Sequence, residues 1–188
     1  MKRLLPIIFI LILSSCSKEV PLEQTVERNG ITYEVNSEEP FTGTTVSYYE
    51  NGQLDSRIPY KNGLQDGLNE SYYENGQLRY KEIFEDGEFD LVEGYHENGQ
   101  LKSKSNYKDR KLDGLQEEYS ENGQLLSKRN WKDGVLDGLE EKYYDNGQLE
   151  SRNNYKDGKE DGLWESYKEN GLLKDLFCFQ KGEIVICD

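Results

Sequence analysis

The stretch Leu-Glu-Glu-Lys-Tyr-Tyr-Asp-Asn-Gly-Gln-Leu-Glu-Ser-Arg-Asn-Asn-Tyr-Lys-Asp-Gly-Lys-Glu-Asp-Gly, residues 139–162, is one copy of a unit that recurs along most of the chain. Its Asn-Gly dipeptide begins at residues 51, 75, 98, 122, 146 and 170, so the successive spacings are 24, 23, 24, 24 and 24. A fixed period of this length indicates a repeat array, in which each unit packs mainly against its neighbours.

Four apolar positions keep a constant distance from each Asn-Gly. Three residues before the Asn stands a tyrosine: Tyr48, Tyr72, Tyr95, Tyr119, Tyr143 and Tyr167. Three residues after it stands a leucine: Leu54, Leu78, Leu101, Leu125, Leu149 and Leu173. Nine after it stands an aromatic residue: Tyr60, Phe84, Tyr107, Trp131, Tyr155 and Phe179. Seven before it stand Thr44, Leu68, Leu91, Leu115, Leu139 and Leu163.

Asn-Gly and Asp-Gly between short alternating segments predict β-hairpins, because glycine adopts the positive φ of tight turns. The loop length can then be chosen by asking on which face of the sheet each apolar side chain would lie. A three-residue loop over 145–147, with a left-handed glycine, pairs Tyr143 with Leu149 and places Leu139 and Tyr155 on the same face. A two-residue loop would instead place Tyr143 and Leu149 on opposite faces. We therefore predict the three-residue loop, with all four apolar positions on one face.

The 23-residue spacing is predicted to arise in a turn. Phe84 and Leu91 are seven residues apart, whereas Tyr155 and Leu163 are eight apart. Shortening the Asp86-Gly87 turn from three residues to two would keep Phe84 and Leu91 on one face.

The opposite face is predicted to be polar, with Lys142 opposite Glu150 and Glu140 opposite Arg152 as cross-strand ion pairs. Six residues after each of the first five Asn-Gly starts comes a basic residue, which predicts a basic ladder of Arg57, Lys81, Lys104, Lys128 and Arg152. Directly before each Asn comes an acid, which predicts an acidic row along the turns: Glu50, Glu74, Glu97, Glu121, Asp145 and Glu169.

Two surfaces are candidates for binding a partner. On the polar face, Trp164 is predicted to lie opposite Leu176, beside Arg152 and Lys128, where earlier units have polar pairs. An aromatic–aliphatic pair with a charged rim is typical of an interface anchor. Alternatively, Trp164 covers the end of the sheet. The other surface is the row of tyrosines, which alternatively forms a core of rings packed against one another.

The chain begins with a short leader. Met1-Lys2-Arg3 is followed by an apolar run from Leu4 to Leu13, which is too short to span a bilayer and is typical of a signal peptide. Leu-Ser-Ser-Cys at 13–16 resembles a bacterial lipobox, so we expect residues 1–15 to be removed and Cys16 to be acylated. Ordinary cleavage, with Cys16 as a free thiol, is the alternative. We expect residues 16–30 to form a tether. By lipoprotein sorting rules, Ser17-Lys18 favours the outer membrane.

Cys178 and Cys187 remain after lipidation of Cys16. In an exported protein a disulfide persists, so these two cysteines are either bonded or two buried thiols.

Composition narrows the classes of function. The net charge of the 188 residues is −14, and loss of Lys2 and Arg3 with the leader leaves 21 basic against 37 acidic residues, a charge of −16. Such a chain repels nucleic acid and anionic lipid surfaces. His96 is the only histidine, and its place in the unit predicts a strand position on the polar face. We therefore expect no enzymatic activity, no metal or other cofactor, and no small-molecule substrate.

The unit Tyr-Tyr-Glu-Asn-Gly-Gln-Leu, followed by Tyr-Lys-Asp-Gly-Lys and Asp-Gly-Leu, resembles the bacterial variant of the MORN repeat over residues 41–182. The resemblance implies an all-β fold over 31–188: a curved, single-layer antiparallel meander of hairpins that acts as an interaction platform. Ile184, Val185 and Ile186 are expected to form a last strand. Bacterial chains of this kind are commonly described as antitoxin components of toxin–antitoxin systems.

We therefore expect a membrane-anchored repeat lipoprotein that binds a protein partner, in the role of an antitoxin or immunity component. The alternative is a structural or surface-display envelope lipoprotein without a toxin partner.

Overall fold

The computed structural model describes residues 18–187. Their regular elements, in chain order, are β1 (Glu19–Pro21), the 3-10 helix η1 (Leu22–Gln24), β2 (Thr25–Arg28), β3 (Ile31–Glu34), β4 (Gly43–Tyr48), β5 (Leu54–Lys61), β6 (Leu64–Gln65), β7 (Gly67–Tyr72), β8 (Leu78–Glu85), β9 (Glu88–Tyr95), β10 (Leu101–Lys108), β11 (Lys111–Tyr119), β12 (Leu125–Lys132), β13 (Val135–Tyr143), β14 (Leu149–Lys156), β15 (Lys159–Tyr167), β16 (Leu173–Gln180) and β17 (Glu183–Val185).

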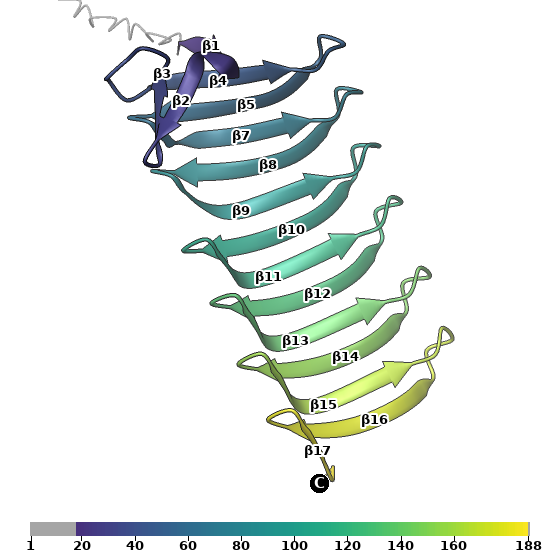
Figure 1. The fold of residues 1–188 in the computed structure, drawn as a ribbon. Coiled ribbons are helices and arrows are strands. Elements are labelled where there is room, and N and C mark those ends of the chain that lie inside the picture. The colour runs from purple at the N-terminus through teal and green to yellow at the C-terminus, as the bar shows by residue number, and fades with distance from the viewer. Residues whose placement is uncertain (1–17, 188) are drawn as a thin grey trace, which may run out of the picture.

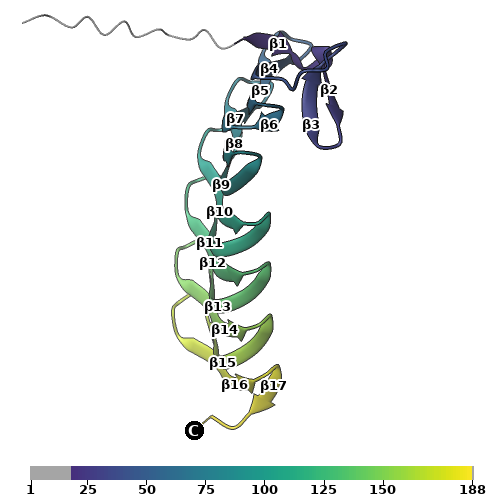
Figure 2. The same cartoon turned by 90° about the vertical axis from the view of Figure 1, so that its left-hand side faces the viewer.

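One long sheet runs through the molecule, as the sequence predicts. From β4 to β17 the strands pair antiparallel in chain order, β6 pairing only with β5, and β1 adds a parallel edge beside β4. Figure 1 shows the curved strands stacked one after another, and Figure 2 shows that most of the array is a single layer. The prediction of an all-β meander of hairpins is confirmed.

The Asn-Gly loop has the predicted length. The Tyr144 N–H donates to the Gln148 carbonyl at 2.9 Å, and the Gly147 N–H donates to the Tyr144 carbonyl at 2.8 Å, which closes a three-residue loop. Gly147 has φ +82°, the left-handed conformation that glycine adopts without strain. Tyr143 pairs with Leu149 across the hairpin, as predicted.

A β-bulge follows this pair and overturns the predicted facing. Lys142 pairs with Ser151, so Glu150 is an extra residue in β14. Because facing alternates along a strand, one extra residue moves everything beyond it to the other face. Tyr155 therefore pairs with Gly138 on the face opposite Tyr143, so the prediction that all four apolar positions share one face is wrong. The predicted pairs Lys142–Glu150 and Glu140–Arg152 are wrong for the same reason.

The bulges give the sheet two faces with different side chains. The face that we call the ladder face carries the Tyr143 and Leu149 rows together with the basic residues equivalent to Arg152. The face that we call the aromatic face carries the residues nine after each Asn: Tyr60, Phe84, Tyr107, Trp131, Tyr155 and Phe179.

The short repeat is explained by a bulge rather than by a turn. Asp133 and Gly134 both have positive φ between the paired residues Lys132 and Val135, so this turn already has two residues. The Asp86-Gly87 turn is the same, and the prediction that it is shortened is wrong. The missing residue is instead the glycine of Asp-Gly-Leu. In other units this glycine, such as Gly138 with φ +117°, lies beside a bulge.

Side chains link each long turn to the next unit. The hydroxyls of Tyr49, Tyr73 and Tyr144 donate to the carbonyls of Tyr72, Tyr95 and Tyr167 at 2.6–2.8 Å. His96 replaces this tyrosine in one unit, and its Nε2 lies 2.9 Å from the Tyr119 carbonyl. His96 follows β9 at the start of the turn, so its predicted position on a strand is wrong. It links units rather than serving a separate chemistry.

The N-terminal end holds the one compact part of the described chain. Residues 19–30, which we expected to belong to a tether, contain β1, η1 and β2 instead. The β2–β3 hairpin lies over the aromatic face in front of the first strands (Figure 1), and the Thr32 N–H donates to the Gly63 carbonyl at 2.9 Å. Val20, Phe41 and Val46 are buried beneath this region.

The C-terminal end is closed by a short strand and a covalent link. β17 pairs with the end of β16 over Glu183–Val185, close to the expected last strand. Cys178 and Cys187 form a disulfide, so the bonded alternative holds. Cys16 lies outside the described residues.

Candidate functional site

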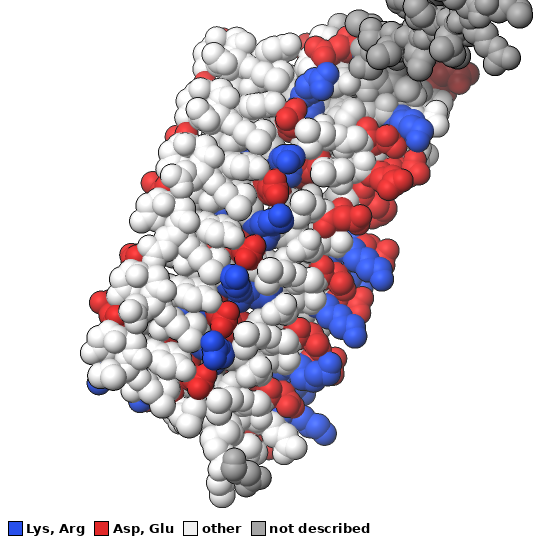
Figure 3. Space-filling model, turned by 180° about the vertical axis from the view of Figure 1, so that it is seen from behind, with Lys and Arg blue, Asp and Glu red and all other residues white. Residues whose placement is uncertain are grey.

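The basic ladder lies on the ladder face, but it is not a free row of cations. Lys81 and Lys104 pair with Glu93 at 3.4 and 3.5 Å, and Lys128 pairs with Glu117 at 3.4 Å. Figure 3 shows basic and acidic side chains alternating in one line along this face. The same alternation continues to Arg152, which contacts Glu141 and Glu165, and begins at Arg57, which contacts Glu19. Each cation is therefore compensated within the fold.

The tyrosine row uses the acids of the same ladder. The hydroxyls of Tyr95 and Tyr143 donate to Glu93 and Glu141, each at 2.9 Å. Burial, followed by these carboxylates, raises the pKa of both tyrosines to about 12. Burial alone raises the pKa of Glu93, but the Tyr95 hydroxyl and two lysines outweigh it and lower that pKa. The ladder face thus satisfies its own polar groups in a pattern that repeats along the array.

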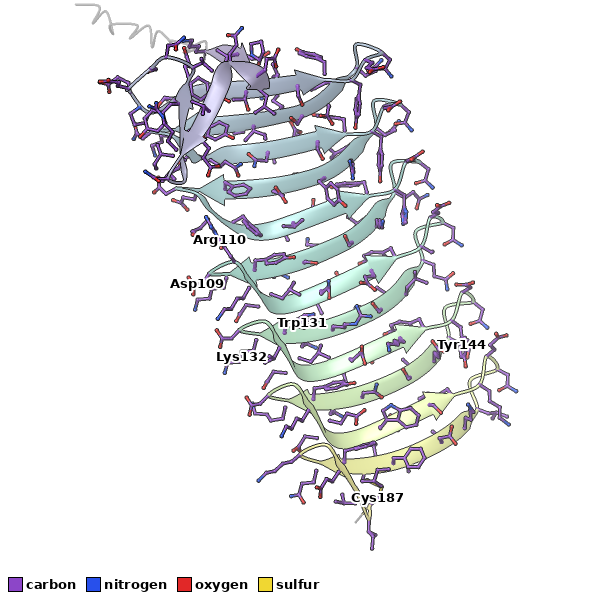
Figure 4. All side chains as sticks on the ribbon, in the orientation of Figure 1. Asp109, Arg110, Trp131, Lys132, Tyr144 and Cys187 are labelled. Carbon is purple, nitrogen blue, oxygen red and sulfur yellow. A yellow bond between two sulfur atoms is a disulfide. The ribbon has the colours of Figure 1, made fainter. Side chains whose placement is uncertain are left out.

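The aromatic face carries rings along the edge of the short turns. Phe84 and Phe89 lie 5.2 Å apart between ring centroids, and Phe89 and Tyr107 lie 5.0 Å apart. Figure 4 is drawn from this side and labels Trp131 on it. The Trp131 indole donates to Gln116 Oε1 at 3.0 Å. Such rings provide large apolar contact area with polar groups at their edges.

Beside the rings, the middle of the aromatic face changes from strand to strand. Ten directly paired residues form what we call the central column: Asn69, Glu82, Val92, Ser105, Gln116, Arg129, Glu140, Asn153, Trp164 and Phe177. The backbone beneath repeats, yet the column contains polar, charged, aliphatic and aromatic side chains. The structure therefore separates a repeating face from a varied one.

A buried ion network lies in the middle of the central column. Arg129 donates to Glu140 at 3.0 Å and to Glu118 at 3.1 Å, and Asn153 donates to the second Glu140 oxygen at 3.1 Å. Glu140 is only 5% exposed. Burial lowers the pKa of Arg129, but the two carboxylates outweigh it and raise that pKa, so the guanidinium stays charged. Three charges held at fixed positions, those of Arg129, Glu118 and Glu140, give the face a specific pattern.

The predicted interface anchor is split between the two faces. Trp164 pairs with Phe177 on the aromatic face, with ring centroids 5.3 Å apart, whereas Leu176 pairs with Glu165 on the ladder face. The prediction that Trp164 lies opposite Leu176 is wrong, because Lys174 is the extra residue of a bulge. Sequence reasoning missed Phe177. The sequence feature that could have identified Phe177 is its position in the repeat, where the two preceding units have the polar residues Arg129 and Asn153.

The fold defines a class, the single-layer antiparallel β-repeat proteins. Within that class, five segments match the family model described as the MORN repeat variant: residues 41–62, 65–86, 91–109, 112–133 and 136–157. They cover more than half of the chain, so the chain belongs to the MORN repeat variant family. A sixth hairpin, β15–β16, continues the sheet beyond the last matched segment. No curated protein matches the chain.

MORN repeats are generally structural or binding units rather than enzymes, and they often bind proteins or membranes. Within residues 18–187, no helix is long and apolar enough to span a membrane. The same residues hold no group of three His, Cys, Asp or Glu side chains arranged for a metal ion.

Proposed function

We propose that this chain is a membrane-anchored protein-binding module of the bacterial cell envelope and that its aromatic face receives the partner. The observation that carries the proposal is the central column, where side chains vary over a repeating backbone. In repeat arrays such a surface sets specificity, while the constant residues maintain the fold. The ladder face, whose charges pair with one another, is the scaffold.

The size and chemistry of the face favour a protein as the partner. Rings along one edge and charges in the middle suit the aromatic anchors and polar contacts of protein interfaces. Nucleic acid is disfavoured because the chain carries a net charge of −14. An acidic chain attracts basic partners, which accelerates their association.

Membrane attachment through Cys16 is part of the proposal. β1 begins at Glu19, so acyl groups on Cys16 would bring the N-terminal end of the array next to the bilayer. Each buried acyl CH₂ contributes about 0.8 kcal/mol, and several chains together anchor a protein stably. The residues after Cys16 favour the outer membrane, with palmitate as one of the chains.

The anchor is tested by the substitution Cys16→Ser. We expect the unchanged chain in the detergent-soluble membrane fraction and the variant in the soluble fraction, because the serine accepts no thioether-linked lipid. The measurement is fractionation followed by mass spectrometry of the N-terminal peptide. Full membrane retention of Cys16→Ser would remove the lipid anchor from the account.

The finer role that we propose is that of an antitoxin or immunity component at the envelope. It follows from the usual description of bacterial chains with this repeat, and the net negative charge of the chain suits neutralisation of a basic toxin. Neighbouring genes and growth discriminate it from the display role. An adjacent toxin gene, with growth arrest on loss of this chain, supports immunity. An isolated locus and normal growth support a structural or display lipoprotein.

A further inference from the structure

A cleft of about 400 Å³ opens where the β2–β3 hairpin crosses the aromatic face. Rings from the sheet line one side of it: Tyr60, Phe84 and Phe89. Glu27 of β2 lines the other side. The cleft thus combines apolar walls with a carboxylate, and it lies at the N-terminal end of the surface proposed to bind protein.

A second carboxylate lies beside the cleft on the central column. Glu82 is two residues from Phe84 on the same face of β8, and it pairs directly with Asn69 on β7. Asn69 donates to Gln65 Oε1 at 3.0 Å, and Gln65 lines the cleft. Glu82 and Asn69 therefore lie next to Phe84 and Gln65, two residues that line the cleft.

The two carboxylates of this cluster have no cationic partner in the described part of the fold. Among the residues that the structure describes, neither Glu27 nor Glu82 has an ion-pair partner. Asn69 is 93% buried, because only 7% of it is exposed, and its Oδ1 accepts no hydrogen bond. A buried acceptor without a donor is costly, so Asn69 Oδ1 marks a place where the fold leaves a polar group unsatisfied, whereas Glu27 is exposed to solvent.

Arg110, the cationic residue that lines the cleft, already has partners within the fold. Arg110, labelled in Figure 4, lines the cleft, but its Nε pairs with Glu88 at 3.4 Å and its Nη2 donates to the Gly87 carbonyl at 3.1 Å. It occupies the turn position that glycine holds in other units. By contrast, Arg129 on the same face is compensated by two acids. Arg110 therefore leaves Glu27 and Glu82 without a cationic partner within residues 18–187.

We infer that this cluster is a socket for a cationic side chain, lysine or arginine, carried by an extended segment of a protein partner. The ammonium or guanidinium group would pair with Glu27 and Glu82. Its aliphatic stem would lie on Tyr60, Phe84 and Phe89, which suits long cationic side chains. The inference rests on the proposed function and names the chemistry of its partner.

The position of Glu82 is consistent with binding rather than with stability. Burial raises the pKa of Glu82, although the bond from Asn69 lowers it. A raised carboxylate pKa favours the folded state below the unfolded pKa of about 4.3, and this advantage is lost as the pH rises through the folded pKa. Glu82→Gln should therefore melt at the same or a higher temperature at pH 7, with no gain below pH 4.

The test uses a displayed library of random 12-residue peptides, selected on the full-length chain in detergent. We expect enriched peptides to contain lysine or arginine next to apolar residues. The chain with Glu27→Gln and Glu82→Gln should bind such a peptide at least about tenfold more weakly, as should a peptide with glutamine in place of its basic residue. The matched control, Glu74→Gln with Glu121→Gln, changes the net charge equally and should leave affinity unchanged.

Each outcome decides the inference. Enriched peptides without basic residues, equal binding by both double variants, or no enrichment would overturn the socket. Melting temperatures of both double variants show that a loss of binding is not a loss of fold. Peptides or a native protein bound through other residues would leave the proposed function standing. A chain that captures no protein at all would contradict the proposed function itself.

Discussion

Replacing Arg129 with alanine is expected to lower the free energy of unfolding by about 3 kcal/mol, because it removes the nearest cation from a buried carboxylate. Arg129 is the donor to both Glu118 and Glu140, and Glu140 is almost fully buried. The neutral amide of Asn153 remains at 3.1 Å from Glu140, and the half-exposed Lys142 remains as a more distant ion-pair partner at 3.8 Å. The measurement is urea denaturation followed by circular dichroism, with m-values compared.

Arg152→Ala is the matched control for this variant. Arg152 occupies the same strand region in the next unit, but it lies on the ladder face with its side chain 44% exposed. Pairs of this kind contribute at most about 1 kcal/mol. Equal losses for Arg129→Ala and Arg152→Ala would contradict the burial of charge on the aromatic face. A Glu140→Gln variant should partly rescue Arg129→Ala, because it removes the orphaned charge.

Replacing Gly63 with alanine is expected to detach the β2–β3 hairpin from the sheet. Gly63 has φ +79°, and a Cβ there would lie 2.4 Å from Ile31 Cγ2 and 2.8 Å from the Thr32 carbonyl oxygen. The backbone conformation alone costs about 1 kcal/mol with a side chain, and the contact with Thr32 forces β3 to move. We expect a loss of about 2 kcal/mol, with hydrogen-exchange protection lost in β2 and β3.

The variant Gly87→Ala separates the backbone cost of a side chain at positive φ from the steric clash with β3. Gly87 has φ +85° in the next short turn, but a Cβ there would approach only Leu64 Cδ2, at 3.4 Å. It shares the backbone cost without the clash. If Gly87→Ala removes as much protection from β2–β3 as Gly63→Ala, the hairpin is not held at Gly63.

The repeat period predicted the array and its long turn because both depend on local chemistry. The position of Asn-Gly fixes the three-residue loop, and Tyr143 and Leu149 flank it at equal distance. The bulge at Glu150 has no comparable local signal, since it contains no glycine. It follows from how two strands align, and charge pairing gave no signal either, because Arg152 meets an acid in both registers: Glu140 without the bulge and Glu141 with it.

Residues 19–30 were assigned to a tether because they share no motif with the repeat. Their strands depend on tertiary contacts, such as that between β1 and β4 and the bond from Thr32 to Gly63. The prediction that Trp164 lies opposite Leu176 failed for the same reason as the prediction that Tyr155 and Tyr143 share a face: each missed a one-residue bulge. A register error of one residue inverts every later assignment of a face.

The central claim is that partners meet the aromatic face while the ladder face is scaffold. Phe177 and Leu176 are neighbours with similar exposure, 40% and 46%, but they pair on opposite faces. A photo-crosslinking phenylalanine analogue at each position, in the full-length chain in cells, compares the two faces directly. The account predicts a discrete crosslinked protein from position 177 and none from position 176. Equal crosslinking from both positions, or crosslinking from position 176 alone, would contradict it.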